Sequence, residues 1–456
     1  MSGKREPKIL PAPAACPSIS ILSKNFRKYF NITLLIKAFL IATAFSFFIY
    51  SEYLEIKNIY LNSILAVISL FFILKADKKL NFWIGFFIGI LWFYWIGLSF
   101  RYYNLSWMIP IVILFVGLVY GIIFWLIEVI SNWIILGISK NLHSFTPSQL
   151  HSLIKSLFLL TLSYIHPFGF NWFIPELTLV NTMFSFDKLS FLLILLAINM
   201  GILGIRKWKL DIRNLGKFFT VFVLLFLAVD FKDCKPKMPN LKIYLSQTKI
   251  PQDVKWDPKY REKIVYSNLK IIDKAIEKGY DLVVLPESAF PMYLNLDDDL
   301  LNILKEKSKK IAIITGGLHY KNSLPYNSSY IFINERLIIA DKVVLVPFGE
   351  ETPLPKFLAK HVNEIFFNGA EDYQKAKKPT DFKIKNIKFR NAICYEATHP
   401  LLYKNAPKYM IAISNNAWFT PSIEPILQNL IIKYYARMHN MVVFHSCNIA
   451  KSDVIW

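Results

Sequence analysis

Cysteine is scarce in this sequence, and its pattern excludes two kinds of site. The four cysteines are Cys16, Cys234, Cys394 and Cys447. They show neither C-x-x-C spacing nor histidine partners at zinc-site spacing, so the sequence predicts neither a metal centre nor a disulfide framework. Cys16 follows two alanines, as at a lipoprotein processing site, but no apolar run precedes it, and we reject that interpretation.

Charged residues are also few for a soluble enzyme. They make up 19% of the 456 residues, whereas hydrophobic residues make up 54% and aromatic residues 16%. This composition indicates a membrane protein with room for two or three domains. Basic residues outnumber acidic ones by 53 to 32, which gives a formal net charge of +21. The excess fits basic membrane loops, or attraction to anionic lipid, rather than nucleic-acid binding, because no nucleic-acid motif accompanies it.

Apolar runs fill the first half of the chain after residues 1–30, a basic, proline-rich segment that we expect to be disordered and cytoplasmic. Several of these apolar runs are about as long as a helix that crosses the hydrocarbon core, which needs roughly 20 residues. The fifth run is interrupted by His166-Pro167, so it either ends there or re-enters the membrane. Together they predict a transmembrane domain of about seven helices over residues 31–231. The runs lie near residues 31–50, 58–75, 82–100, 108–131, 153–170, 189–205 and 216–231.

Basic residues alternate between the predicted loops. The N-terminus and the loops after the second, fourth and sixth runs are rich in lysine and arginine, and the intervening loops hold Lys57, Arg101 and Lys188, one each. By the positive-inside rule, this pattern places the N-terminus in the cytoplasm. Seven crossings then carry the chain after about residue 232 to the outer side, which in a bacterium is the periplasm. Lys37 and Glu128 are ionisable residues within the runs, and such residues are functional candidates by default.

The composition changes near residue 235, where lysines and prolines form a linker. Beyond it, short apolar strands alternate with helical patterns, which predicts a mixed α/β domain over residues 232–456. Glu287, Lys342 and Cys394 each follow a predicted strand, and ligands bind at the carboxyl ends of strands in such sheets. Acyl transfer through a thiol needs a nucleophile, a base and a cation for the oxyanion, which these three residue types can supply. Each residue alone is more often inert or solvated.

Four motifs then occur in order along the second half. As a set, they resemble the nitrilase (carbon–nitrogen hydrolase) superfamily. Because these motifs follow a multi-span region in the sequence, they resemble the apolipoprotein N-acyltransferase family in particular. The resemblance implies an α-helical multi-span membrane domain followed by an α/β nitrilase-like αββα sandwich that faces the periplasm. The motifs are Leu285-Pro286-Glu287-Ser288, Lys342 with Pro347-Phe348-Gly349-Glu350, Ile393-Cys394-Tyr395-Glu396 and Asn416-Ala417-Trp418-Phe419.

The same resemblance implies a Glu-Lys-Cys triad. In it, Glu287 is the general base, Lys342 stabilises the oxyanion and Cys394 is the nucleophile. For Glu350 and Glu396 the alternative is a structural ion pair, and for the two tryptophans it is a membrane anchor. Supporting or substrate-binding roles are predicted for Glu350, Tyr395, Glu396, Trp256 and Trp418.

The implied enzyme is an acyltransferase of the bacterial inner (cytoplasmic) membrane that needs no metal or cofactor. Cys394 would take an acyl chain from a phospholipid donor as a thioester. It would pass the chain to the α-amine of the diacylglyceryl-cysteine of a diacylated apolipoprotein, the last step of lipoprotein maturation. The alternatives are a membrane-tethered nitrilase-type amidase and a non-catalytic homologue. An ion-coupled transporter is disfavoured, because the runs show no evident charge pairs.

Two features depart from the family's pattern. Asn416 stands where aspartate is usual, and Ala450 stands in a turn where glycine is usual. The family usually continues beyond the position of Trp456 with further strands and an eighth span. We therefore expect differences in stability and anchoring, while the predicted triad lies within the chain.

Overall fold

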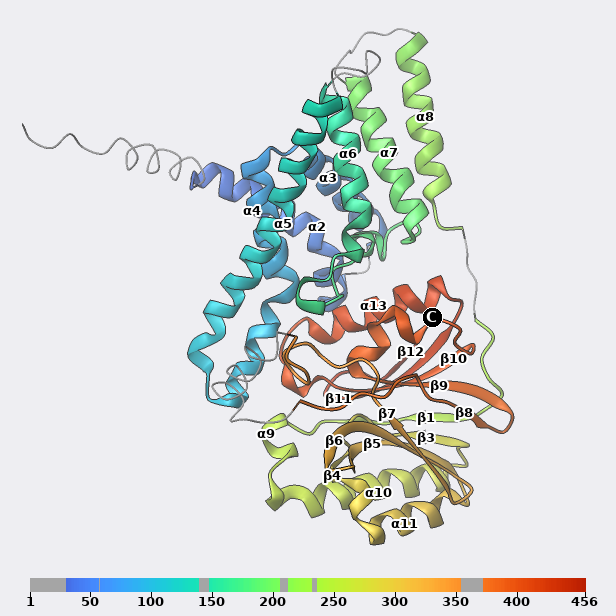
Figure 1. Ribbon diagram of the computed structural model, residues 1–456. Helices are drawn as coiled ribbons and strands as arrows, with labels where there is room; N and C mark the ends of the chain where they lie inside the picture. Colours follow the sequence, from blue (N-terminus) through green and yellow to red (C-terminus); the bar gives the residue numbers. More distant parts are fainter. Residues whose placement is uncertain (1–29, 57, 139–146, 206–211, 232–235, 354–371) are drawn as a thin grey trace, which may run out of the picture.

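A helical bundle lies on an α/β domain, and the chain runs from the first to the second (Figure 1). The computed structural model describes residues 30–56, 58–138, 147–205, 212–231, 236–353 and 372–456. The helices of the bundle are α2 (Ile32–Tyr53), α3 (Ile59–Lys75), α4 (Lys78–Phe93), α5 (Ile109–Ile138), α6 (Pro147–Thr161), α7 (Lys188–Ile205) and α8 (Ile212–Ala228).

Each predicted apolar run corresponds to one of these helices. Among the described residues, three helical stretches are long and apolar enough, by length and composition, to cross a membrane: Ile32–Tyr53, Lys78–Tyr103 and Ser106–Gly137. The apolar parts of α3, α6, α7 and α8 are shorter. The fifth run ends early, because α6 stops at Thr161 and the chain continues through short 3-10 turns before α7 begins.

Small residues let α4 and α5 approach closely. Gly85 and Gly89 on α4, and Gly117 and Gly121 on α5, each form a G-x-x-x-G pair. A Cβ on Gly85 would lie 2.5 Å from the backbone oxygen of Tyr120, so only glycine fits there. Close backbone packing through such pairs is a main source of helix association where both helices are surrounded by lipid.

A buried ionic cluster connects α5 and α6, which corrects the expectation of unpaired charges in the spans. Lys155 Nζ lies 2.9 Å from Glu128 Oε2, and His151 Nε2 lies 3.1 Å from Glu128 Oε1. Lys155 Nζ also donates to the backbone oxygen of Ala76 at 2.8 Å. Lys37, the other predicted ionisable residue, is exposed on α2. Sequence reading missed this pairing because His151 and Lys155 lie more than 20 residues beyond Glu128, on another helix.

In its described residues, the α/β domain contains two six-stranded sheets. In the first sheet the order is β1 (Ile243–Leu245), β3 (Leu282–Val284), β5 (Ala312–Lys321), β6 (Leu324–Ile333) and β7 (Arg336–Asp341), with β4 (Phe290–Tyr293) paired to β5. In the second it is β12 (Asp453–Ile455), β11 (Val442–Asn448), β10 (Tyr409–Asn415), β9 (Ile387–Ile393) and β8 (Asp381–Ile384), with β2 (Gln247–Thr248) paired to β11. β9, β10 and β11 are parallel, so their carboxyl ends meet at one edge.

The two sheets pack face to face and helices cover their outer faces, which confirms the predicted αββα sandwich. Apolar side chains such as Val284 and Ile413 fill the space between the sheets. α10 (Arg261–Glu277) and α11 (Asp298–Ser308) cover the first sheet, and α13 (Glu424–Met438) covers the second. The short helix α9 (Gln252–Lys255) follows β2.

α13 lies between the second sheet and the helical bundle (Figure 1). Ile432 and Ala436 pack against the sheet, while Leu427 and Ile431 belong to the core of the bundle. A helix that is apolar on opposite faces is typically buried on both. The bundle and the sandwich therefore share one packed interface, and the carboxyl ends of the central strands lie beside it.

Candidate active site

Cys394 stands at a sharp turn after β9. The strand ends at Ile393, and a 3-10 helix begins at Cys394, whose φ is +52°. For a residue other than glycine, such a conformation costs on the order of 1–3 kcal/mol and is concentrated at functional sites. Burial and the carboxylate of Glu287 raise the pKa of the Cys394 thiol well above its ordinary value. The resting thiol is therefore protonated, and a base must remove its proton before it can attack.

Glu287 follows β3 and is held by two donors. Asn327 Nδ2 donates to Glu287 Oε1 at 2.8 Å, and the backbone N–H of Asn415 donates to Oε2 at 2.8 Å. The side chain is buried, and the neighbouring strand approaches it through Gly316. A Cβ on Gly316 would lie 2.7 Å from the Cα of Glu287, so a larger residue would displace this carboxylate.

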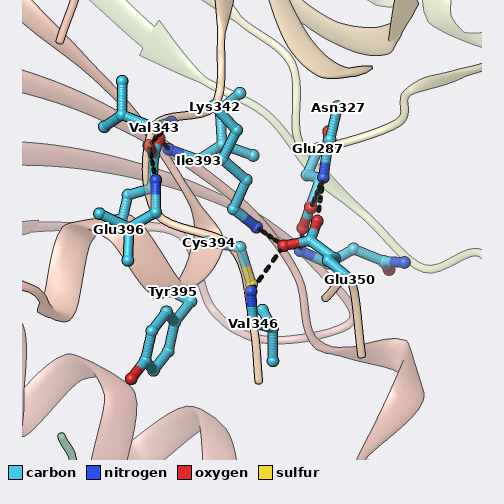
Figure 2. Close-up of polar contacts among 12 residues, drawn as sticks. Glu287, Asn327, Lys342, Val343, Val346, Glu350, Ile393, Cys394, Tyr395 and Glu396 are labelled. Carbon is cyan, nitrogen blue, oxygen red and sulfur yellow. Dashed lines mark hydrogen bonds and ion pairs between the residues drawn. The ribbon is translucent and has the colours of Figure 1, made fainter. Parts of the chain in front are cut away.

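Lys342 follows β7 and is completely buried. Its Nζ lies 2.6 Å from Glu350 Oε2, which also accepts from the backbone N–H of Val346 at 2.9 Å (Figure 2). Asn327 Nδ2 donates to Glu350 Oε1 at 2.7 Å as well as to Glu287, so one amide connects the two carboxylates. Burial alone would lower the pKa of Lys342, but the carboxylates of Glu350 and Glu287 more than offset it, and the net shift is upward. Lys342 is therefore a permanent cation.

A cavity of about 480 Å³ brings the three predicted catalytic residues together. Four of the five predicted supporting residues also line it: Glu350, Tyr395, Trp256 and Trp418. The rest of its wall is mainly apolar and comes from the helical bundle, including Phe93, Val112, Val116 and Tyr120. The cavity thus joins a cysteine, a carboxylate and a buried cation to a hydrophobic wall formed by α5, residues 93–108 and residues 167–172.

Comparison with known proteins agrees with both halves of this architecture. Residues 32–229 match the family model of the apolipoprotein N-acyltransferase integral membrane domain, and residues 247–453 match the carbon–nitrogen hydrolase model. The chain is 42% identical over 415 residues to the apolipoprotein N-acyltransferase of Wolinella succinogenes. This match covers 91% of this chain and 94% of the relative. It is also 38% identical over 405 residues to the apolipoprotein N-acyltransferase of Helicobacter pylori, a match that covers 87% of this chain and 88% of the relative. The chain belongs to the apolipoprotein N-acyltransferase family.

Glu396, a predicted supporting residue of this family member, lies behind the cavity wall and fixes the turn that carries Cys394. Glu396 Oε2 accepts from the backbone N–H of Ile393 at 2.8 Å. Its Oε1 accepts from the N–H groups of Val343 at 2.5 Å and Val344 at 3.1 Å. Burial raises the pKa of Glu396 to about 7, although Lys342 and the three N–H groups oppose the shift. This one carboxyl connects the segment after Lys342 to the segment before Cys394.

Tyr395 connects the same turn to the helical bundle. Its hydroxyl accepts from the backbone N–H of Asn171 at 3.1 Å and donates to the backbone oxygen of Gly169 at 3.3 Å. Its ring stacks on Phe170 and Trp172, with ring centroids 5.7 and 6.2 Å away. In Figure 2, Tyr395 points away from Glu287 and Glu350. Its contacts therefore fit a positioning role between the two domains.

The two predicted tryptophans differ in surroundings. Trp418 stacks on Tyr103 at 5.9 Å and meets Tyr102 edge to face at 5.5 Å, so both of its partners come from the bundle. Trp256 follows α9 at the cavity wall and is 38% exposed. Trp418 thus closes the cavity against the bundle, and Trp256 borders its solvent side.

Sequence reasoning missed two groups of this site. Asn327 lies in the middle of β6, where a polar residue in an alternating strand has no distinguishing signal. Lys255 directly precedes Trp256 in the segment that the resemblance singled out, but a lysine in a short polar helix reads as solvated. It is instead buried, and its Nζ donates to the backbone oxygen of Glu287 at 2.8 Å.

Lys255→Met is expected to remove a pH dependence from stability. Burial lowers the pKa of Lys255 to about 7, and the charge of the Glu287 carboxylate offsets this only in part. Above pH 7 the unfolded chain therefore binds more protons at this residue, and the free energy of unfolding rises with pH by up to about 1.4 kcal/mol per unit until roughly pH 10. Thermal unfolding in detergent from pH 6 to 10 should show the stability of the wild type and of Lys259→Met, an exposed control, rising relative to that of Lys255→Met. Parallel curves for all three proteins would contradict the prediction.

Proposed function

We propose that this chain transfers an acyl chain from a phospholipid to the α-amine of the diacylglyceryl-cysteine at the N-terminus of apolipoproteins. Residues 31–231 form the transmembrane domain, residues 1–30 lie in the cytoplasm, and residues 232–456 form a catalytic domain in the periplasm. The alternation of basic loops supports this orientation in the inner membrane. The names of the relatives support acyl transfer over hydrolysis.

The observation that carries the proposal is the shape of the cavity. Its polar end holds Cys394, Glu287 and Lys342, and its apolar wall continues along α5 and residues 93–108 of the bundle. An acyl chain gains about 0.8 kcal/mol for each CH₂ that it buries. A phospholipid can thus place its chain against the bundle while its ester lies at the thiol. A soluble amidase substrate has no need of such a wall.

The first half-reaction acylates the enzyme. Glu287 takes the proton of the Cys394 thiol, and the sulfur attacks the ester carbonyl of the phospholipid. The oxyanion that forms is stabilised by the permanent charge of Lys342, which Glu350 holds in place. The carbon–oxygen bond of the ester breaks, and the leaving glycerol oxygen takes the proton from Glu287. The products are a lysophospholipid and a thioester on Cys394.

The second half-reaction transfers the chain to the acceptor. The neutral α-amine of the diacylglyceryl-cysteine attacks the thioester carbonyl, and Lys342 again stabilises the oxyanion. Glu287 takes a proton from the nitrogen, the carbon–sulfur bond breaks, and the thiolate of Cys394 recovers that proton. An amide is formed and the enzyme returns to its starting state.

Mass spectrometry of the purified protein tests both steps. Incubation with phosphatidylethanolamine should add the mass of one acyl group to a peptide that contains Cys394. A diacylated lipopeptide should then remove that mass and gain it as an N-acyl group. If the adduct forms but only free fatty acid appears when the lipopeptide is added, the chain is a hydrolase and the proposal is wrong.

A further inference from the structure

A second buried carboxyl lies at the cavity and has no part in the mechanism above. Glu424 is the first residue of α13, is 2% exposed and lines the cavity beside Cys394. In the described part of the chain, no lysine, arginine or histidine forms an ion pair with it. A buried carboxyl with no cation is costly to keep ionised, so such a group is a candidate for function.

Uncharged amides connect Glu424 to the sulfur. Asn416 Nδ2 donates to Glu424 Oε2 at 2.9 Å and to Gln428 Oε1 at 3.0 Å. Gln428 Nε2 in turn donates to Cys394 Sγ at 3.7 Å. All three polar residues are at least 98% buried, and the Oδ1 of Asn416 has no donor among the described residues. This path shares no side chain with the Glu287–Asn327–Glu350–Lys342 group, so it reaches the reacting sulfur independently.

The pKa of Glu424 is close to that of an α-amine. Burial raises the pKa of Glu424 to about 8, and the Glu287 carboxylate adds to the shift while Asn416 opposes it. An α-amine has a pKa of about 7.7–8.0. The proton of an α-ammonium can therefore pass to Glu424 with little change in free energy. Glu424 also interacts with the thiols of Cys394 and Cys447, and burial raises the pKa of both.

We propose that Glu424 binds the α-ammonium of the acceptor beside the thioester and removes one of its protons. This inference rests on the proposed function. With a pKa of about 8, Glu424 is mostly protonated at pH 7, and its ionised fraction takes a proton from the –NH₃⁺ group, which leaves a neutral –NH₂ and a neutral carboxylic acid. The nitrogen lone pair then attacks the thioester of Cys394, and Glu287 takes the second proton as described above. The acid form of Glu424 returns its proton to solvent after the product leaves.

The test separates the two half-reactions. Glu424→Gln should form the phospholipid-derived thioester within about threefold of the wild-type rate, since Glu287, Lys342 and Cys394 are intact. Transfer from the isolated thioester to a diacylated lipopeptide should be about 10²-fold slower at pH 7. The deficit should shrink above pH 9, where the free amine is already neutral. A purely structural role would slow both half-reactions at every pH, and that result, like unchanged transfer, would overturn the inference.

Two further variants keep this test decisive. Glu424→Asp should retain part of the transfer rate, because it keeps the carboxyl on the same element. Glu424→Gln combined with Asn416→Asp returns a carboxyl to the adjoining residue and should regain at least tenfold over Glu424→Gln alone. Absence of any thioester in the wild type would instead overturn the proposed function itself. If the wild type forms the thioester but neither variant transfers faster than Glu424→Gln, only the role of Glu424 would be overturned.

Discussion

Cys394→Ala is expected to abolish acyl transfer, with a loss of at least about 10⁴-fold, because in the proposed mechanism the thiol carries the chain between donor and acceptor. The acyl adduct should also disappear from the peptide that contains residue 394. Stability should change by less than about 1 kcal/mol, since in the described part of the chain the sulfur has one weak polar contact, to Gln428 at 3.7 Å. The positive φ at this position is the same for alanine as for cysteine, so the turn itself is not relieved.

Cys447→Ala is the matched control for this variant. Cys447 is a buried cysteine on β11, the strand next to β10, and its sulfur lies 3.4 Å from His445 Nε2. Replacing it removes the same atom from the same domain without touching the cavity lining. Its transfer rate and its adduct should match those of the wild type. Transfer that persists in Cys394→Ala would mean that no thioester forms on Cys394 in the reaction.

The sequence allowed the fold and the candidate catalytic residues to be predicted for a physical reason. Buried parallel strands are continuous apolar runs, so strands such as β3 and β10 are evident, and residues at their carboxyl ends share an edge. Glu287 and Cys394 follow the parallel strands β3 and β9, Lys342 follows the antiparallel edge strand β7, and the structure brings all three to one cavity. Their assignment as a triad came from the motif resemblance rather than from strand pattern, and it remains a prediction.

The partners of these residues were not predictable, because they depend on contacts between distant parts of the chain. Asn171 and Tyr395 are 224 residues apart, and Glu287 and Asn415 are 128 apart. No local pattern distinguishes the buried Asn327 or Lys255 from a solvated polar residue. The pairing of Glu128 with Lys155 was missed for the same reason. In each case the burial that gives the group its chemistry is a property of the packed interface.

Lys342→Met is expected to damage both activity and stability. Loss of the oxyanion cation should reduce the transfer rate by about 10²–10³-fold, as for other single donors to an oxyanion. The substitution also leaves the partly buried carboxylate of Glu350 near that of Glu287 without its cation. Breaking one partner out of a buried ion pair typically costs about 3–5 kcal/mol. The free energy of unfolding and the rate of N-acylation, measured on the same preparation in detergent, should both fall.

A second substitution separates these two effects. Lys342→Met combined with Glu350→Gln removes both charges of the pair, and an amide at position 350 can still accept from the N–H of Val346. Most of the lost stability should return, because no uncompensated charge is left at position 350. Activity should stay at the level of Lys342→Met, since the oxyanion still has no cation. Recovery of activity together with stability would show that Lys342 acts by holding the site together, and it would remove the oxyanion role from the mechanism.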